Sequence, residues 1–207
     1  MSCEKVKAVD IAKGYLQAVS KAIAEIPASD VSTAADALFQ TWIREGTVFL
    51  VGNGGSAATA SHLMNDLTKL TRVPGQRPFK AMALTDNVPL MTAWANDDEF
   101  ANIFVEQLRT FIRPVDLVLA MSTSGNSPNL VRALEFARGQ GAATVAFTGR
   151  SGGRLKECAD ICICVPCDDI GQQEDAHMVV SHVMAYSVRA LLTAHAGVSQ
   201  GNPARIA

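Results

Sequence analysis

The sequence predicts an α/β protein, a three-layer α/β/α sandwich around a five-stranded parallel sheet, preceded by two helices. Short β-branched, apolar runs alternate with helical patterns from residue 46 onward, and such alternation builds a mostly parallel sheet covered on both faces. Two Gly/Ser-rich loops, at 52–56 and 122–127, each follow an apolar run and precede a helical pattern. The 207 residues contain no repeat, low-complexity tract or linker, so we expect a single domain over 1–207.

Two helices are expected ahead of the sheet, at 4–26 and 32–45. The first keeps apolar residues at roughly helical spacing and is closed by Pro27, and the second is capped by Ser29 or Ser32 and ends near Gly46. Both helices are amphipathic and would leave apolar surface uncovered in a monomer. We therefore expect residues 1–45 to serve oligomerisation and residues 46–196 to form the α/β core.

The strands and helices of the core are expected to alternate along the chain. The predicted strands are 47–51, 80–84, 116–121, 142–148 and 160–165. The predicted helices are 56–70, 88–94, 100–112, 128–139, 152–157 and 172–195. Ligands of such sheets bind beyond the carboxyl ends of the strands, so both Gly/Ser loops should lie on one rim.

The composition argues against nucleic acid and membranes as partners. Eighteen basic and twenty acidic residues give a net charge of −2 without a long run of either sign, which disfavours nucleic-acid binding. No stretch approaches the roughly twenty apolar residues of a membrane span, and the start of the sequence lacks an apolar signal core, so a cytoplasmic protein is expected.

The cysteines allow two interpretations. Four of the five, at 158, 162, 164 and 167, lie close together, and such clustering can indicate a metal site. However, 161–165 reads as a buried strand, where cysteine acts as a small hydrophobic residue, and the spacing matches no common zinc or iron–sulfur pattern. The core interpretation is therefore favoured.

The two Gly/Ser loops carry the chemistry of a phosphate site. Glycine lets the backbone turn tightly and approach a ligand, and the helix behind each turn offers unpaired N–H groups to an anion. The second loop adds hydroxyl and amide donors, which suit a phosphate on a small polar molecule. The first loop also fits G-x-G-x-x-A at Gly52, Gly54 and Ala57, but the acidic residue expected of a dinucleotide site is missing from 73–78.

Histidine and carboxylate side chains on two of the predicted helices suggest a metal site or a pair of acid/base groups. His62 and Asp66 share one helix face at i and i+4, and the last helix carries Glu174, His177 and His182. These residues suit a zinc-type divalent site or an acid/base pair, although a surface ion pair or a core histidine would show the same spacing. Asp97, after Asn96, is read either as a site residue or as the cap of the helix at 100–112.

Taken together, these motifs resemble the sugar isomerase (SIS) domain family, with a flavodoxin-like sheet, and within it the phosphoheptose isomerases. The resemblance covers nearly the whole chain and rests on the motif at 51–56, on His62 with Asp66, on 95–97, 122–127 and 147–149, and on the last helix. It implies an aldose–ketose isomerase that converts sedoheptulose 7-phosphate to D-glycero-D-manno-heptose 7-phosphate through an enediol, with zinc, as a homotetramer or homodimer.

The resemblance also implies roles for individual residues. The serine-rich loop would hold the phosphate, and the first loop with the 96–97 pair would line the sugar. The implied substrate-binding residues are Asn53, Gly54, Ser56, Asn96, Asp97, Ser122, Thr123, Ser124, Ser127 and Glu174. The implied zinc ligands are His62, Asp66, Glu174 and His182, of which Asp66 and His182 would be the catalytic acid/base groups. The resemblance further implies that the pairs His62/Asp66 and Glu174/His182 meet when subunits assemble.

Three positions depart from the family pattern. Asp66 stands where the family has Glu, Glu174 where it has Gln, with Gln173 as the rival position, and Leu70 where it has Arg. These departures leave open another seven- or six-carbon sugar phosphate as substrate. A non-catalytic SIS protein that binds a protein partner is the alternative of a different class.

Overall fold

The sheet has five strands, all parallel, as the sequence predicts. The computed structural model describes residues 7–200, so the predicted helical residues 4–6 and the segment 201–207 lie outside the described part. The strands are β1 (Val48–Gly52), β2 (Ala81–Ala83), β3 (Leu117–Ser122), β4 (Ala143–Thr148) and β5 (Ile161–Cys164). Their order is β2-β1-β3-β4-β5, the flavodoxin-like order in which the direction of winding reverses between β1 and β3.

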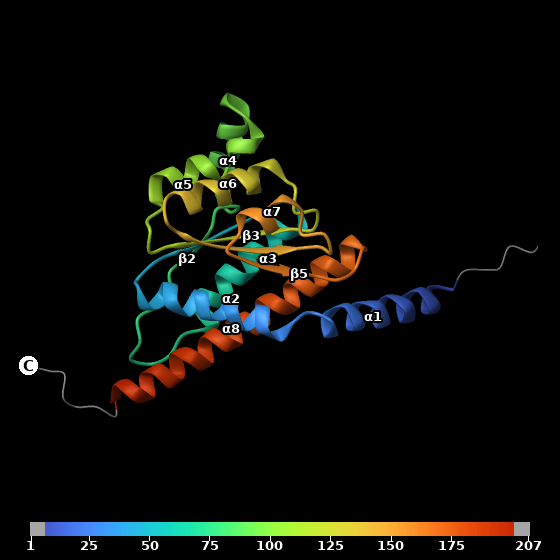
Figure 1. The fold of residues 1–207 in the computed structure, drawn as a ribbon, viewed down its shortest axis with the longest axis horizontal. Helices are drawn as coiled ribbons and strands as arrows, with labels where there is room; N and C mark the ends of the chain where they lie inside the picture. The colour runs from blue at the N-terminus through green and yellow to red at the C-terminus, as the bar shows by residue number, and fades with distance from the viewer. Residues whose placement is uncertain (1–6, 201–207) are drawn as a thin grey trace, which may run out of the picture.

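Two layers of helices cover the sheet (Figure 1). One face packs against α2 (Ala28–Ile43), α3 (Gly55–Asn65) and α8 (Ile170–Gln200), and the other against α5 (Val105–Phe111), α6 (Pro128–Gly139) and α7 (Gly153–Cys158). On this second side α4 (Val88–Asp97) stands out beyond α5. None of the described helices has the length and apolar character that crossing a bilayer requires.

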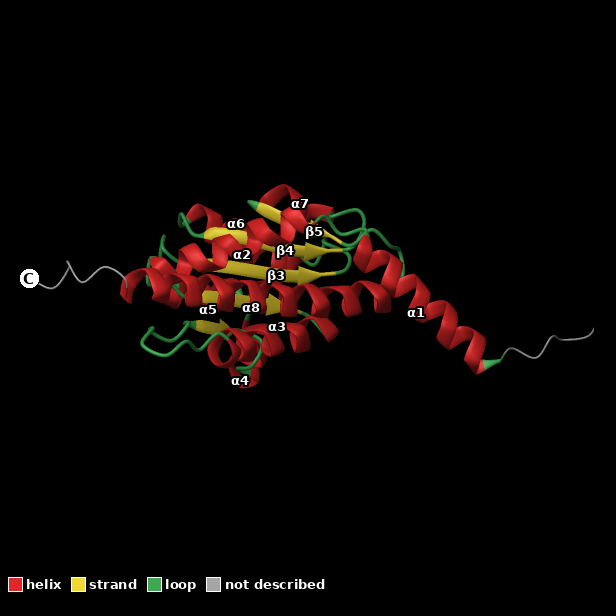
Figure 2. Ribbon diagram, turned by 90° about the horizontal axis from the view of Figure 1, so that it is seen from below, coloured by secondary structure: helices red, strands yellow, loops and turns green. Residues whose placement is uncertain are grey.

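The first helix, α1 (Ala8–Ala24), extends away from the body (Figure 2). A hydrogen bond from the Tyr15 hydroxyl to the Asp175 carboxylate (2.7 Å) joins it to α8. The second helix begins at Ala28, directly after Pro27, which takes the N-cap position with an extended backbone (φ −63°, ψ 117°). The predicted cap at Ser29 or Ser32 is therefore wrong, because the proline starts the helix before either serine is reached.

The central strands are buried on both faces, which explains their continuous apolar runs. Every residue of β1 and β3 is buried, and alternate residues face opposite layers. Leu50 contributes to the cluster under α3 and α8, while Phe49 and Val51 contribute to the cluster under α5 and α6. At the sheet edge, Cys162 and Cys164 lie on β5 with free thiols, which confirms the strand. The predicted burial is only partial, since both cysteines are half-buried on an edge strand.

Several helices differ from their predicted lengths. The predicted helix 56–70 is α-helical to Asn65 and continues as a π-helical turn, Asp66–Leu70, in which the Thr71 N–H donates to the Asp66 carbonyl five residues earlier (3.2 Å). The predicted helix 100–112 is a 3₁₀ turn, Phe100–Asn102, followed by α5. The last helix is longer than predicted at both ends, since no proline or capping glycine interrupts it.

Candidate active site

The first Gly/Ser loop turns tightly from β1 into α3. Gly54 has φ +55°, which favours glycine, and a Cβ on Gly52 would lie 2.5 Å from the Ser56 carbonyl oxygen. Ser56 is buried in the first turn of α3, and Asn53 is half-buried in the loop. The backbone therefore wraps closely around the amino end of α3, where unpaired N–H groups favour a negative or polar ligand.

The second loop gathers hydroxyl groups between β3 and α6. The Ser122 Oγ lies 3.3 Å from the hydroxyls of both Ser124 and Ser127, and the loop is closed by the Gly125 N–H, which donates to the Ser122 carbonyl (3.1 Å). Thr123 is half-buried, and its carbonyl accepts from the Gly149 N–H (2.9 Å). Three convergent hydroxyls ahead of a helix N-terminus form a neutral, donor-rich site suited to a phosphate.

A pair of asparagines connects the two loops. Asn53 Nδ2 donates to Asn129 Oδ1 (3.0 Å), and Asn129 Nδ2 donates back to Asn53 Oδ1 (2.8 Å). Asn129 is buried in the first turn of α6. Asn129 does not stand out in the sequence, because an asparagine near a helix start has an ordinary local explanation. Its place just after the serine-rich loop is the one available signal of a role at the site.

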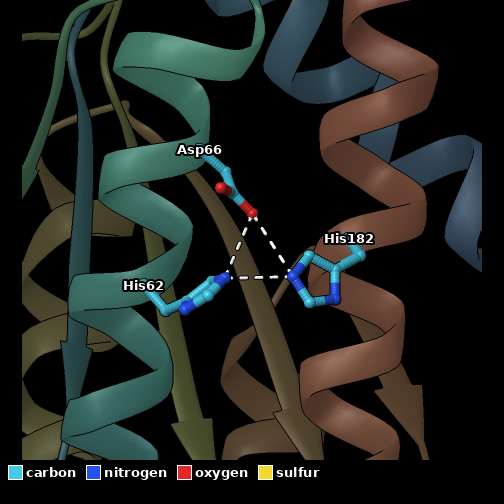
Figure 3. A group of neighbouring side chains, drawn as sticks. All are labelled: His62, Asp66 and His182. Atoms are coloured by element: carbon cyan, nitrogen blue, oxygen red, sulfur yellow. Dashed lines mark hydrogen bonds and ion pairs between the residues drawn. The ribbon is translucent and has the colours of Figure 1, made fainter.

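His62, Asp66 and His182 come together between α3 and α8 (Figure 3). The two Nε2 atoms of the histidines are 3.0 Å apart, and Asp66 Oδ2 lies 3.5 Å from His62 Nε2 and 3.6 Å from His182 Nε2. Both imidazoles are about half exposed, whereas the Asp66 side chain is 12% exposed. This group forms within one chain, so it does not need subunit assembly, contrary to what the resemblance implied.

The chemistry of this group fits a divalent cation. Asp66 Oδ2 is buried and has no hydrogen-bond partner, although a buried acceptor is normally paired. Two imidazole nitrogens and a carboxylate oxygen are donors that zinc prefers, and donors about 2.1 Å from a tetrahedral ion are about 3.4 Å from one another. The observed separations of 3.0, 3.5 and 3.6 Å are close to that value.

Glu174 lies apart from this group, at the first loop. Its carboxylate packs against Gly55, where a Cβ would lie 2.5 Å from Glu174 Oε1. Eight residues separate Glu174 from His182, about 12 Å along the helix axis, so the two side chains leave α8 at different heights. Gln173 points elsewhere, since its Nε2 donates to the Cys167 carbonyl (2.8 Å). Of the two rival positions, Glu174 is the one that faces α3.

Asn96 and Asp97 end α4 and are both exposed. Asn96 Nδ2 donates to Asp97 Oδ1 (2.8 Å). Asp97 does not cap the following helix: α5 starts after Phe104, and no side chain caps it. That reading of Asp97 is wrong because a 3₁₀ turn separates the two helices. The helix that carries the pair, α4, packs on the side of the sheet opposite α3 and α8.

Comparison with known proteins identifies the family. Residues 14–149 match the SIS domain. The chain belongs to the SIS domain family. Among its relatives, a phosphoheptose isomerase from Akkermansia muciniphila is 41% identical over 165 residues, covering 79% of this chain and 86% of the relative. The lincomycin biosynthesis protein LmbN from Streptomyces lincolnensis is 36% identical over 186 residues, covering 85% of this chain and 68% of the relative.

Solved structures agree with this assignment. The phosphoheptose isomerase GmhA from Neisseria gonorrhoeae superimposes with a TM-score of 0.83 at 27% identity, covering 89% of this chain and 100% of that chain. A phosphoheptose isomerase from Francisella tularensis gives the same TM-score at 29% identity and the same coverage. Within the SIS family, the chain therefore belongs with the phosphoheptose isomerases.

One histidine of α8 is part of the core rather than of the site. His177 is buried against Phe147, its Nε2 lies 3.2 Å from the Thr148 carbonyl oxygen, and its Nδ1 has no partner. Burial lowers the pKa of His177 to about 4, opposed in part by the hydrogen bond to the Thr148 carbonyl, which favours the protonated ring.

The low pKa of His177 predicts a loss of stability on acidification. The unfolded histidine takes up a proton near pH 6.5, whereas the folded one does so only near pH 4. The contribution of neutral, buried His177 to the free energy of unfolding is therefore complete above pH 6.5. It falls by about 3 kcal/mol as the pH drops to 4. Urea denaturation between pH 7 and 4 should show that the free energy of unfolding of the wild type falls with pH in this way. The free energy of unfolding of His177→Gln should fall less steeply. Equal slopes in the two proteins would contradict the prediction.

Proposed function

We propose that this protein is an aldose–ketose isomerase that interconverts sedoheptulose 7-phosphate and D-glycero-D-manno-heptose 7-phosphate. The observation that carries the proposal is the meeting of His62, Asp66 and His182, in a chain of the phosphoheptose isomerase group whose two loops are rich in hydrogen-bond donors. A protein that only binds a partner has no chemical need for a buried carboxylate without a hydrogen bond next to two imidazoles, so the enzyme is favoured over the non-catalytic alternative.

The phosphate is bound by the serine-rich loop in this proposal. Ser122, Ser124 and Ser127 converge within hydrogen-bond distance and can turn their hydroxyl protons toward phosphate oxygens, with Thr123 beside them. The free N–H groups at the start of α6 add partial positive charge. At the other loop, Asn53, Gly54, Ser56 and Glu174 line the sugar, and Asn96 and Asp97 bind its hydroxyls from α4.

The reaction moves one proton between neighbouring carbons. A base removes a proton from C1 of the ketose, O2 gains a proton, and an enediol forms; a proton then adds to C2 while O1 loses its own, which leaves the aldose. We assign these transfers to Asp66 and His182. The two side chains are neighbours, with Asp66 Oδ2 3.6 Å from His182 Nε2.

His62, Asp66 and His182 would hold a divalent cation, zinc by donor type. The predicted fourth ligand, Glu174, is not brought to this group within the chain, because its carboxylate packs against Gly55 at the first loop. When bound, such an ion stabilises negative charge on the oxygens of the reacting carbons. Asp66 has one methylene fewer than glutamate, yet its carboxylate reaches both imidazole nitrogens, so the shorter side chain is compatible with this role.

Proton NMR in deuterated buffer tests the reaction. Sedoheptulose 7-phosphate incubated with the protein and zinc should give aldoheptose anomeric signals, and solvent deuterium should enter the sugar at C2. Asp66→Asn and His182→Ala should each lower the rate at least a hundredfold, because each removes a proton-transfer group. The matched control is His195→Ala on the same helix, where the ring packs against Trp42. No product and no deuterium uptake in the wild type would refute the heptose assignment.

Metal analysis tests the cation site separately from activity. Protein purified with zinc and dialysed should hold about one ion per chain, and His62→Ala should lose it, because two ligands bind zinc far more weakly than three. His195→Ala should retain the ion. Equal zinc content in wild type and His62→Ala would rule out this group as the binding site.

The protein forms a homo-oligomer in this proposal. The first helix, α1, exposes Val9, Ile11 and Leu16 at 54, 60 and 64%, and α8 exposes Val183 and Tyr186. An apolar groove lined by Ile23, Ile26, Val31 and Val183 runs between the first two helices and α8. A second copy of the chain is the occupant that fits, because amphipathic helices with free apolar faces on the same side can cover one another.

Light scattering after size-exclusion chromatography tests the assembly. Leu16→Glu and Val183→Glu should each lower the measured mass relative to wild type, because a charge would be buried in the interface. Val88→Glu is the matched control, since Val88 is equally exposed but lies on α4 across the sheet. A monomeric wild type would overturn the proposal.

A further inference from the structure

The two asparagines between the loops form a reciprocal pair, in which Asn129 is buried and Asn53 is half-buried. Asn129 is 1% exposed, and each amide donates one hydrogen bond to the other and accepts one from it, at 2.8 and 3.0 Å. Exchanging oxygen and nitrogen on both side chains leaves the same two bonds, so the pairing does not depend on how the amides are oriented. A reciprocal pair of this kind fixes both the position and the rotation of Asn53.

The two loops differ in how they are held. The serine-rich loop has backbone anchors to its neighbours: the Leu155 N–H donates to the Gly125 carbonyl (2.9 Å) and the Gly149 N–H to that of Thr123 (2.9 Å). The first loop contains Gly54 and Gly55, which give the backbone its greatest freedom, and the hydrogen bonds of the Asn53 carbonyl stay local, to Ala57. Both side-chain hydrogen bonds of Asn53 go to Asn129.

We infer that Asn129 is a positioning residue, which acts through Asn53 to hold the sugar-binding loop in register with the phosphate-binding loop. This inference rests on the proposed function for the roles of the two loops. A substrate held at its phosphate by one loop and at its reacting carbons by the other needs a fixed distance between them, because small misplacements of the reacting atoms cost large factors in rate. Asn129 acts through Asn53 in this inference rather than on the substrate, because its own side chain is 1% exposed.

Kinetics of Asn129→Ala test the inference. We expect kcat to fall at least tenfold, while the competitive inhibition constant of inorganic phosphate changes less than threefold, because the serine hydroxyls and their anchors remain. Asn53→Ala should likewise lower kcat and leave the inhibition constant of phosphate nearly unchanged. The kcat of the double variant should be no lower than that of Asn53→Ala, since Asn129 acts only through Asn53. Additive losses in the double variant would overturn the inference.

A matched control separates positioning from general destabilisation. Thr144 is also fully buried and makes two side-chain hydrogen bonds to Asp160, at 2.8 and 2.9 Å, at the amino end of β4 and away from both loops. Thr144→Val should lose comparable stability but keep kcat. If Thr144→Val lowers kcat as much as Asn129→Ala, or if phosphate inhibition weakens in parallel with kcat, Asn129 is merely structural.

Amide hydrogen exchange gives a readout that needs no activity. In Asn129→Ala the amides of 53–56 should exchange at least tenfold faster than in wild type, and those of 122–127 at an unchanged rate. A wild type without isomerase activity would refute the proposed function, yet the exchange result would still decide whether Asn129 tethers the first loop. Unchanged exchange at 53–56 would refute the tether whatever the activity.

Discussion

The side-by-side packing of α3 and α8 is the constraint on which the site depends. At the amino ends of these helices, Glu174 packs on Gly55, and about two turns further along, His182 meets His62 and Asp66. The contact at Gly55 is possible because glycine has no side chain: a Cβ there would lie 2.5 Å from the Glu174 carboxylate. Both helices pack on the same face of the sheet through Leu63, Val180 and Met184. Core packing therefore sets how far apart the two imidazoles stand.

The sheet topology supplies the other half of the site. Winding reverses between β1 and β3, which are hydrogen-bonded neighbours, so the loops that leave their carboxyl ends lie next to each other. The register Gly52↔Met121 brings the start of the first loop level with the end of β3. The Asn53–Asn129 pair then spans the space between the loops. Backbone topology brings the loops together, and the two amides fix how they face each other.

The sequence predicts the sheet better than it predicts the site. Continuous apolar runs bounded by glycine or polar residues identify all five strands, because central parallel strands are buried on both faces. Helix ends are less certain, since Pro27 and the 3₁₀ turn at Phe100–Asn102 each move a boundary by several residues. Helical spacing alone pairs His62 with Asp66, but it contains no information on His182, which lies 120 residues away. That contact, and the role of Asn129, arise from tertiary packing.

The same helix, α8, carries two histidines with opposite environments, which shows why the histidine pattern alone could not assign their roles. His177 is buried and its ring is kept neutral by burial, whereas His182, five residues on, is half exposed beside the Asp66 carboxylate. Five residues on a helix rotate the side chain by about 140°, enough to turn from the core to the side of α8 that meets His62 and Asp66. Asp66 provides the complementary case, a buried acceptor without a partner. Such an acceptor costs folding free energy, and it is retained here at the point where the proposed chemistry needs a carboxylate that is free to bind a cation or a proton.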